Sequence, residues 1–226
     1  MNWEDECYLL SKRKFRENAN IINIFSPSKG KVSGVVYGGN SRKIRNYLQL
    51  SNKLYISYNS KNENKLGYFK TELMKPISPL YFNDRKRTSA LVSICSMLNI
   101  LLPESQPNRK IYSSLEKFIS SIKLDNWIIL YIFFELNLIK ELGFDPNLIA
   151  FEDKVSNSSD IQRIKIDNNV FEIPGYLILK KLPQEISNDL IKKSLYFTRN
   201  IIQNKFFNNN NVIFPQSRVQ LENYFR

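Results

Sequence analysis

Apolar residues in the first third of the chain fall in short runs separated by turn-forming residues, a pattern typical of β-strands. The segment Ser26–Gly30, Ser-Pro-Ser-Lys-Gly, is one such turn signal. Five strands are predicted, at Cys7–Leu10, Ile21–Phe25, Val32–Tyr37, Leu54–Tyr58 and Leu66–Leu73. A charged loop over residues 12–17 is expected to join the first two strands.

Beyond Pro76 and Pro79 the apolar residues recur three and four apart, which is typical of helices. A first helix, ending before Pro103, is predicted from the shared face of Leu91, Ile94, Cys95, Leu98 and Leu102. A second is predicted over 108–122 and a third over 125–142, with Asp125 as its N-cap and Gly143 as the glycine that closes it. Apolar residues surround nearly the whole third helix, so we expect it at the centre of a second domain.

The helical pattern fails between Asp153 and Pro174, where short extended pieces are predicted, and returns at about Gln184 in an amphipathic helix with a basic polar side. Pro215 opens a short final helix. The predicted fold class is α+β: a five-stranded OB-fold barrel over 1–77, then a mostly α-helical domain over 78–226 with a short irregular insert at about 150–175. An SH3-like barrel fits the strand pattern almost as well.

Positive charge is concentrated at the two ends of the chain. The net charge is +12, with a pI near 9.6. Residues 1–80 hold fourteen Lys and Arg against six Asp and Glu, and residues 176–226 hold eight against three. This distribution indicates a polyanionic partner, nucleic acid before an anionic membrane surface, although a Lys- and Asn-rich genomic composition produces the same excess.

Composition excludes several kinds of chemistry. The chain has no histidine, which rules out catalytic triads, histidine metal sites and imidazole bases. Cys7 and Cys95 are far apart in sequence, which supports neither a zinc site nor a disulfide and indicates buried thiols of a reducing cytosol. The acidic start is unlike a secretory signal and the longest apolar run, 127–134, is too short to span a bilayer. We expect a cytoplasmic protein without metal or cofactor.

A glycine pair follows the third predicted strand and is itself followed by cations. Gly38 and Gly39 can adopt positive φ, so we expect the strand to end there and a loop to present Arg42, Lys43 and Arg45. With the first loop and the preceding turn, the residues predicted to neutralise phosphates are Arg13, Lys14, Arg16, Lys29, Lys31, Arg42, Lys43 and Arg45. Tyr37 and Tyr47 flank the basic loop and are predicted to stack on bases.

The order and spacing of several motifs resemble the RecO family of bacterial DNA repair proteins. In the first domain they are the acidic segment at 3–6, Arg-x-x-x-Glu at 13–17, Ser-Pro-Ser-Lys-Gly-Lys at 26–31, Gly-Gly-x-Ser-Arg at 38–42, Leu-Gln at 48–49 and Leu-Gly-Tyr-Phe-x-x-Glu at 66–72. In the second they are Phe-Glu-Leu-x-Leu-x-x-Glu-Leu-Gly-Phe at 134–144 and Phe-Pro-x-x-Arg at 214–218.

The resemblance implies an OB-fold on a helical domain, no catalytic chemistry, and a role as recombination mediator. Such a protein binds single- and double-stranded DNA, anneals complementary strands, pairs with RecR and helps RecA replace single-strand-binding protein. Many family members carry a four-cysteine zinc module after the Gly-Phe motif, whereas residues 145–174 of this chain contain no cysteine, so no metal is expected.

The resemblance also implies a binding site for the acidic, phenylalanine-terminated tail of single-strand-binding protein, which needs an apolar pocket and cations. The residues expected to form it are Lys192, Phe197, Arg199, Arg218 and Leu221. The same basic helix could instead be a second DNA surface or an ordinary amphipathic helix end.

Two other functions are consistent with parts of the pattern. The barrel could bind RNA in a protein with a helical protein-interaction domain, such as a ribosome-associated factor, because recognition of a 2′-hydroxyl is not visible in sequence. A nuclease built from scattered acids has no support, since runs such as Glu4–Glu6 are consecutive rather than convergent.

Overall fold

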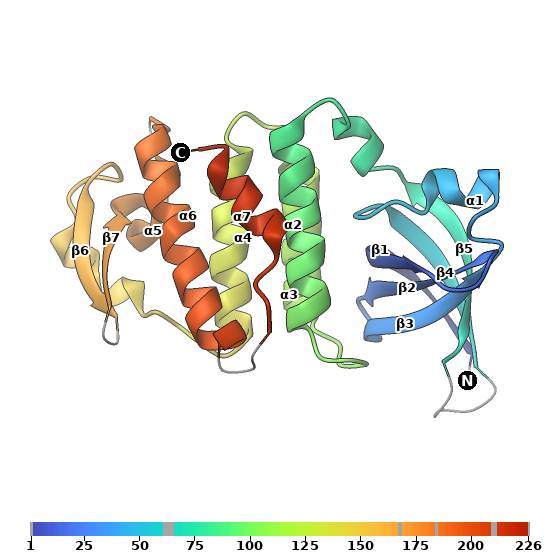
Figure 1. Ribbon diagram of the computed structural model, residues 1–226. Helices are drawn as coiled ribbons and strands as arrows, with labels where there is room; N and C mark the ends of the chain where they lie inside the picture. Colours follow the sequence, from blue (N-terminus) through green and yellow to red (C-terminus); the bar gives the residue numbers. More distant parts are fainter. Residues whose placement is uncertain (1, 61–65, 167–168, 184, 209–211, 226) are drawn as a thin grey trace. The chain divides into compact units, whose positions relative to one another are not determined.

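The computed structural model describes residues 2–60, 66–166, 169–183, 185–208 and 212–225. The chain divides into two compact units, Met1–Tyr112 with Pro215–Arg218, and Ser113–Phe214 with Val219–Arg226. The predicted α+β class is confirmed: a closed five-stranded sheet comes first and helices dominate the remainder (Figure 1). The predicted domain boundary after residue 77 stays a prediction, and the first unit also contains the helix that follows it.

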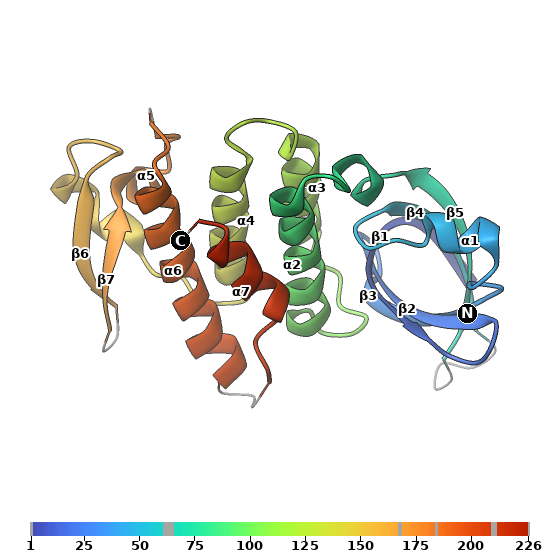
Figure 2. The same ribbon diagram turned by 45° about the horizontal axis from the view of Figure 1, so that its top comes forward.

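The strands of the first unit form a closed barrel, seen as a ring in Figure 2. They are β1 (Asn2–Lys14), β2 (Ala19–Ser26), β3 (Gly30–Tyr37), β4 (Lys53–Asn59) and β5 (Tyr68–Lys75). Their order around the ring is β1-β2-β3-β5-β4, and β4 pairs back with β1. The pairing is antiparallel except between β3 and β5, where Val35 faces Tyr68 in a parallel bridge. With α1 (Arg42–Tyr47) between β3 and β4, this is the expected OB-like arrangement.

Alternate strand residues fill the barrel. The core consists of Cys7, Leu9, Ile22, Ile24, Val32, Val36, Leu48, Leu54, Ile56 and Phe69. Gly34 makes room for the largest of these side chains, because a Cβ at that position would lie 2.4 Å from the Phe69 ring. Ile44 and Tyr47 of α1 pack against the same core, as do Trp3 and Tyr58 from the strands.

Helix α2 (Arg85–Leu101) packs against the barrel within the first unit. A 3₁₀ turn, η1 (Ser78–Tyr81), precedes it, and the Asp84 carboxylate caps its start by accepting a hydrogen bond from the Arg87 backbone N–H at 3.0 Å. Asn23 of β2 donates to the Asn99 side chain at 2.7 Å. The helix is therefore tied to the outer face of β2.

The start of α3 (Arg109–Ser121) covers the same face. The Tyr112 ring lies 5.5 Å from Tyr8 and 5.4 Å from Phe25, and its hydroxyl donates to the Glu6 carbonyl at 2.7 Å. The outer surface of β2 and β3, which many OB-folds use for ligands, is thus partly covered by the chain's own residues 99–112.

In the second unit, α4 (Trp127–Glu141) and α6 (Asn188–Ile202) lie side by side (Figure 1). Nine of the residues of α4 are buried, so it is enclosed around most of its circumference, as predicted. Its buried Glu135 accepts hydrogen bonds from Tyr131 on α4 and Thr198 on α6. The predicted N-cap is wrong, because the capping position is Asn126. Gly143 does follow the helix with φ +98°, as expected.

The segment predicted as an irregular insert has defined structure. A 3₁₀ stretch, η2 (Leu148–Lys154), is followed by a hairpin of β6 (Ile161–Ile166) and β7 (Asn169–Pro174), which confirms the extended pieces. Phe171 of this hairpin packs edge-on against Phe197 of α6 at 5.3 Å.

The remaining elements are α5 (Gly175–Leu179), the π-helical turn η3 (Gln203–Phe207) and α7 (Gln216–Asn223). A short helix after Pro215 was expected, and α7 confirms it. Among the described residues, no helix has the length and apolar character needed to cross a membrane.

Candidate nucleic-acid interface

Hydrogen bonds join the β1–β2 loop to the turn that follows β3. The Gly38 backbone N–H donates to the Asn18 carbonyl at 2.7 Å, with Gly38 at φ +70°. The Asn40 side chain donates to the Glu17 carbonyl at 2.7 Å and accepts from the Asn20 side chain at 3.0 Å. Two segments that are far apart in sequence, each rich in cations, are thereby held together.

The cations after the glycine pair lie on a short helix rather than on the predicted loop. The Ser41 hydroxyl caps α1 by accepting from the Ile44 backbone N–H at 3.4 Å. Because Ile44 and Tyr47, three positions apart, pack against the barrel core, the helix is fixed in orientation. The cations on the rest of the helix surface are exposed: Arg42, Lys43 and Arg45.

Lys12 contacts the carboxyl end of α1. The predicted charged loop was wrong here, because residues 12–14 belong to β1. The Lys12 ammonium donates to the Leu48 carbonyl at 2.8 Å, which places a positive charge at the carboxyl end of the helix. Burial lowers the pKa of Lys12, and the neighbouring Arg45 charge lowers it further. Positive charges therefore already crowd this surface.

We call the exposed cations of the β1–β2 region and of α1 the cation cluster: Arg13, Lys14, Arg16, Arg42, Lys43 and Arg45. None of them forms an ion pair within the part of the chain that the structure describes. Arg16 is held at φ +69° with its guanidinium 5.2 Å from the Phe15 ring centre. Such a surface can bind a polyanion without first breaking internal ion pairs.

Two predicted phosphate contacts lie elsewhere. Lys29 is exposed, but it sits in the β2–β3 turn, at the opposite end of the strands from the loop that carries Arg16. The length of β2 separates these ends by about 23 Å. Lys31 is buried: its ammonium donates to the Asn99 carbonyl at 2.9 Å and pairs with Glu104 at 3.3 Å. It holds the chain after α2 against the barrel and is not available to a phosphate.

The two predicted stacking tyrosines differ. Tyr37 is 61% exposed at the end of β3, as stacking on a base requires. Tyr47 is half-buried, and its hydroxyl donates to the Thr71 carbonyl at 2.7 Å, so its ring serves the barrel. The exposed partner of Tyr37 is instead Tyr68, 38% exposed, whose ring centre lies 6.3 Å away. The parallel bridge that starts β5 beside β3 brings these rings together, and sequence spacing does not reveal it.

The predicted tail-binding residues, on α6 and α7, differ in burial. Phe197 and Leu221 are fully buried, as is Arg218, so none of them presents a surface. Lys192 and Arg199 line a pocket of about 630 Å³. The exposed ring beside them is Tyr196, 48% exposed, which sequence reasoning missed although it lies three residues from Arg199 on the polar side of the helix.

The charges around this α6 pocket are largely paired. The Arg199 guanidinium lies 3.0 Å from the Glu222 carboxylate and 5.5 Å from the Tyr196 ring centre. Lys193 pairs with Asp189 at 2.5 Å and with Glu172 at 3.5 Å, and the bond to Asp189 raises the pKa of Lys193. This surface carries less free positive charge than the sequence indicates.

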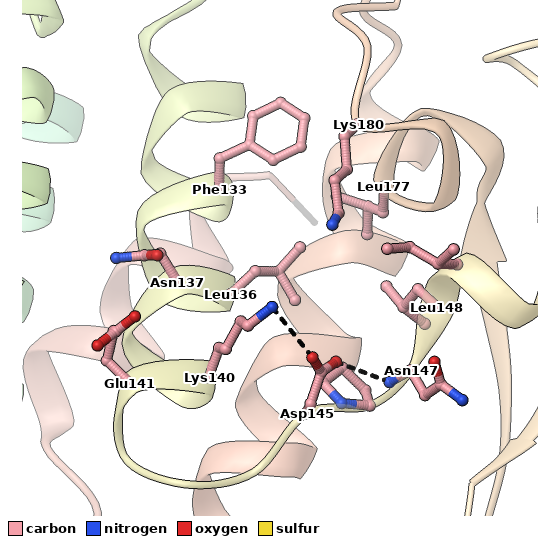
Figure 3. A pocket seen from close by; sticks show the side chains of 12 residues that line it. Phe133, Leu136, Asn137, Lys140, Glu141, Asp145, Asn147, Leu148, Leu177 and Lys180 are labelled. Carbon is pink, nitrogen blue, oxygen red and sulfur yellow. Dashed lines mark hydrogen bonds and ion pairs between the residues drawn. The ribbon is translucent and has the colours of Figure 1, made fainter. Parts of the chain in front are cut away.

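A further pocket of about 500 Å³ lies beside α4 (Figure 3). Its lining is partly apolar, with Leu136 and Leu148 among the residues, and some of its polar groups bond to each other. Lys140 pairs with Asp145 at 3.2 Å. The Asn147 backbone N–H, and then Lys140, hold the pKa of Asp145 below its usual value. No group of three or more His, Cys, Asp or Glu suited to a metal ion occurs in the described ranges.

Comparison with known proteins identifies two matching family models and several relatives. Residues 1–77 match the family model "Recombination protein O N terminal", and residues 83–150 match "Recombination protein O C terminal". Proteins called "DNA repair protein RecO" are similar: one from Cereibacter sphaeroides is 32% identical over 148 residues, which cover 66% of this chain and 62% of that protein. One from a Wolbachia of Drosophila simulans is 33% identical over 150 residues, with the same coverage.

Fold and surface define an OB-fold protein with a basic rim and a helical C-terminal region. The two matched models follow each other in the order of these parts. The chain belongs to the RecO family. It spans about 62% of the length of the curated relatives it matches.

Proposed function

We propose that this protein is a non-enzymatic DNA-binding recombination mediator that anneals complementary strands and helps RecA load on single-stranded DNA coated by single-strand-binding protein. The observation that carries the proposal is the cation cluster, which two hydrogen-bonded segments form without internal ion pairs among the described residues. The proposed setting is the bacterial cytoplasm, with the protein at the nucleoid. RecR as a partner rests on family membership alone.

The physical role of the cluster is to neutralise phosphates. Each neutralised phosphate releases a counterion and contributes about 0.7 to the salt slope on single-stranded DNA. Exposed rings beside the cluster, Tyr37 and Tyr68, can stack on unpaired bases without sequence preference. Annealing needs both properties, because charge must be screened while bases stay free to pair.

A strand-annealing assay tests the proposal. Two complementary oligonucleotides are coated with single-strand-binding protein, and duplex formation is followed for wild type and for the triple variant Arg42→Ala, Lys43→Ala, Arg45→Ala. The variant should anneal slowly, and its binding to single strands should lose about 2 units of salt slope. The side chains are exposed on α1 and alanine favours helix, so the fold should persist.

A matched control removes the same charge elsewhere. Lys117, Lys123 and Lys181 are exposed and outside the cluster, and their triple alanine variant should anneal as wild type does. If both triple variants lose the same salt slope, net charge rather than the cluster governs binding and the assignment fails. An RNA strand in the same titration separates DNA binding from the RNA-binding alternative.

For the tail of single-strand-binding protein we propose the α6 pocket of Lys192, Tyr196 and Arg199. An aromatic ring beside paired cations suits a peptide that ends in acidic residues and a phenylalanine, since its carboxylates can compete with Glu222 for Arg199. The pairing of Lys193 and Arg199 with internal acids argues against a second DNA surface here.

Titration of a labelled tail peptide tests this pocket. Arg199→Ala and Tyr196→Ala should each weaken binding about tenfold, as expected for loss of a charge-assisted bond or of an exposed aromatic contact. Lys165→Ala, an exposed lysine on the neighbouring hairpin, is the control. Equal affinities for all four proteins would place the tail elsewhere.

A further inference from the structure

A pocket of about 520 Å³ borders the β2–β3 turn, at the other end of β2 from the loop that carries Arg16. We call it the barrel-mouth pocket, and its lining residues are Trp3, Ser28, Lys29, Val32, Tyr58, Ser60, Ser105 and Pro107. All of them belong to the first compact unit. The volume lies within the range of small-molecule sites and is far too small for a duplex.

One wall of this pocket is held in place by the buried cation that sequence analysis had assigned to DNA. Lys31 pairs with Glu104 at 3.3 Å, and the Ser105 backbone N–H donates to the Lys31 carbonyl at 2.8 Å. The segment approaches so closely that a Cβ on Gly30 would lie 2.2 Å from the Gln106 carbonyl oxygen. The pocket is therefore preformed, which reduces the entropy that a ligand must lose on binding.

Another part of the lining is aromatic and carries two hydrogen-bonding groups. Trp3 and Tyr58 stack with ring centres 5.1 Å apart and an interplanar angle of 24°. Over the described ranges, neither the Trp3 indole N–H nor the Tyr58 hydroxyl has a hydrogen-bond partner. Both groups reach solvent, so each is open to a partner. A planar ligand with polar edges would supply one.

Lys29 adds a cation at the rim. It is exposed, forms no ion pair with any described residue, and lines the same pocket. Stacked aromatic rings, free hydrogen-bonding groups and a neighbouring ammonium are the features that single-strand binding sites combine for a base and its phosphate.

We propose that the barrel-mouth pocket receives one unpaired nucleobase of a bound single strand, with Lys29 on the adjoining phosphate. This inference rests on the nucleic-acid binding proposed above, but it concerns a different surface. The cation cluster contacts only phosphates, whereas this pocket requires an unpaired base. It therefore gives the protein a preference for single strands over duplex.

Tryptophan fluorescence provides a direct test, because the chain has two tryptophans and the other, Trp127, is 5% exposed in the second unit. In a Trp127→Phe variant, all tryptophan emission comes from Trp3. An oligothymidylate should quench it, while an oligonucleotide of equal length made of abasic sites should bind, by fluorescence anisotropy of an end label, without quenching.

The outcomes separate this inference from the proposed function. Binding of both oligonucleotides with no quenching by either, or equal quenching by both, overturns the base pocket and leaves phosphate binding intact. Absence of any anisotropy change overturns both.

Hydroxyl deletions give a second test in the full chain that needs no tryptophan change. Tyr58→Phe should weaken oligothymidylate binding about fivefold, the effect of one lost hydrogen bond, and leave abasic binding unchanged. Tyr55→Phe is the matched control on the same strand, since its hydroxyl bonds to Glu4 instead. Identical affinities for oligothymidylate in wild type and Tyr58→Phe would refute the hydrogen-bonding role of the pocket.

Discussion

Replacing Asn40 by alanine should weaken DNA binding without changing the charge of the protein. Asn40 helps to join the β1–β2 loop, which carries Arg16, to the turn that leads into α1, through one bond to the Glu17 carbonyl and one from Asn20. With both bonds gone, the Gly38 N–H still bonds to the Asn18 carbonyl, but Arg16 is held less firmly beside the cations of the helix.

The structure allows the size of the effect to be worked out. Two hydrogen bonds are lost and the buried Asn20 amide loses its acceptor, which costs about 2 kcal/mol of unfolding free energy. For a chain of this size that lowers the melting temperature by about 4 to 8 °C. If every member of the cation cluster neutralises one phosphate, the salt slope on single strands is about 4. It should fall by up to about 0.7, the contribution of Arg16, because Arg13 and Lys14 stay fixed on β1.

The assay is anisotropy of a labelled oligothymidylate at several salt concentrations, with thermal melting of the same samples. Asn23→Ala is the matched control. It also removes two side-chain hydrogen bonds from the barrel, to Asn99 at 2.7 Å and from Ser33 at 2.8 Å, but it does not touch the cluster. It should lower the melting temperature by a similar amount and leave the salt slope unchanged.

The reasoning is refuted if Asn40→Ala melts lower, as expected, and yet keeps the wild-type salt slope and affinity. Local geometry would then be irrelevant, and the cations would act only through their number.

Three further predictions concern stability and the role of buried groups. Gly30→Ala should cost at least about 2 kcal/mol in urea unfolding, because φ is +72° and the new Cβ would meet the Gln106 carbonyl oxygen. Lys31→Met should lower the melting temperature but leave the DNA salt slope unchanged, since Lys31 binds Asn99 and Glu104 rather than phosphate. Burial raises the pKa of both Cys7 and Cys95, the latter to about 12. The unfolding free energy should therefore have its full value at pH below the unfolded thiol pKa of about 8.5. It should decrease as the pH rises above that value, by up to about 1.4 kcal/mol per pH unit for each thiol. Urea titrations of wild type and of a Cys7→Ala, Cys95→Ala variant across that range check this, and a double variant with the same alkaline loss would contradict it.

Local pattern was enough for most of the fold. Strand runs and helix spacing depend on neighbours a few residues apart, so the barrel strands, α4 and the final helix could be read from the sequence. Helix caps were less secure: Asp125 and Asn126 are both good capping residues, and the chain uses the second. The helical state of residues 42–47 was missed because it depends on Ile44 and Tyr47 reaching the barrel core, a long-range contact.

The candidate sites were less accessible to sequence reasoning, for a related reason. A lysine looks the same on a turn whether it faces solvent or an acid from another segment, so Lys31 and Lys29 could not be told apart. Burial of Phe197 rather than Tyr196 follows from the packing of α6 against β7, where Phe197 meets Phe171, a contact that adjacent positions in the sequence do not fix. Tyr68 lies beside Tyr37 because β3 pairs with β5, and this pairing is not visible in the sequence.

The covering of the β2–β3 face limits where this protein can be truncated. Tyr8 and Phe25 are shielded by Tyr112, which lies well past the last barrel strand, so a fragment cut after residue 77 would leave aromatic rings bare. Such a fragment would tend to self-associate through its exposed apolar patch, and its measured affinity for DNA would not represent that of the native surface. A usable minimal fragment should therefore extend through Tyr112.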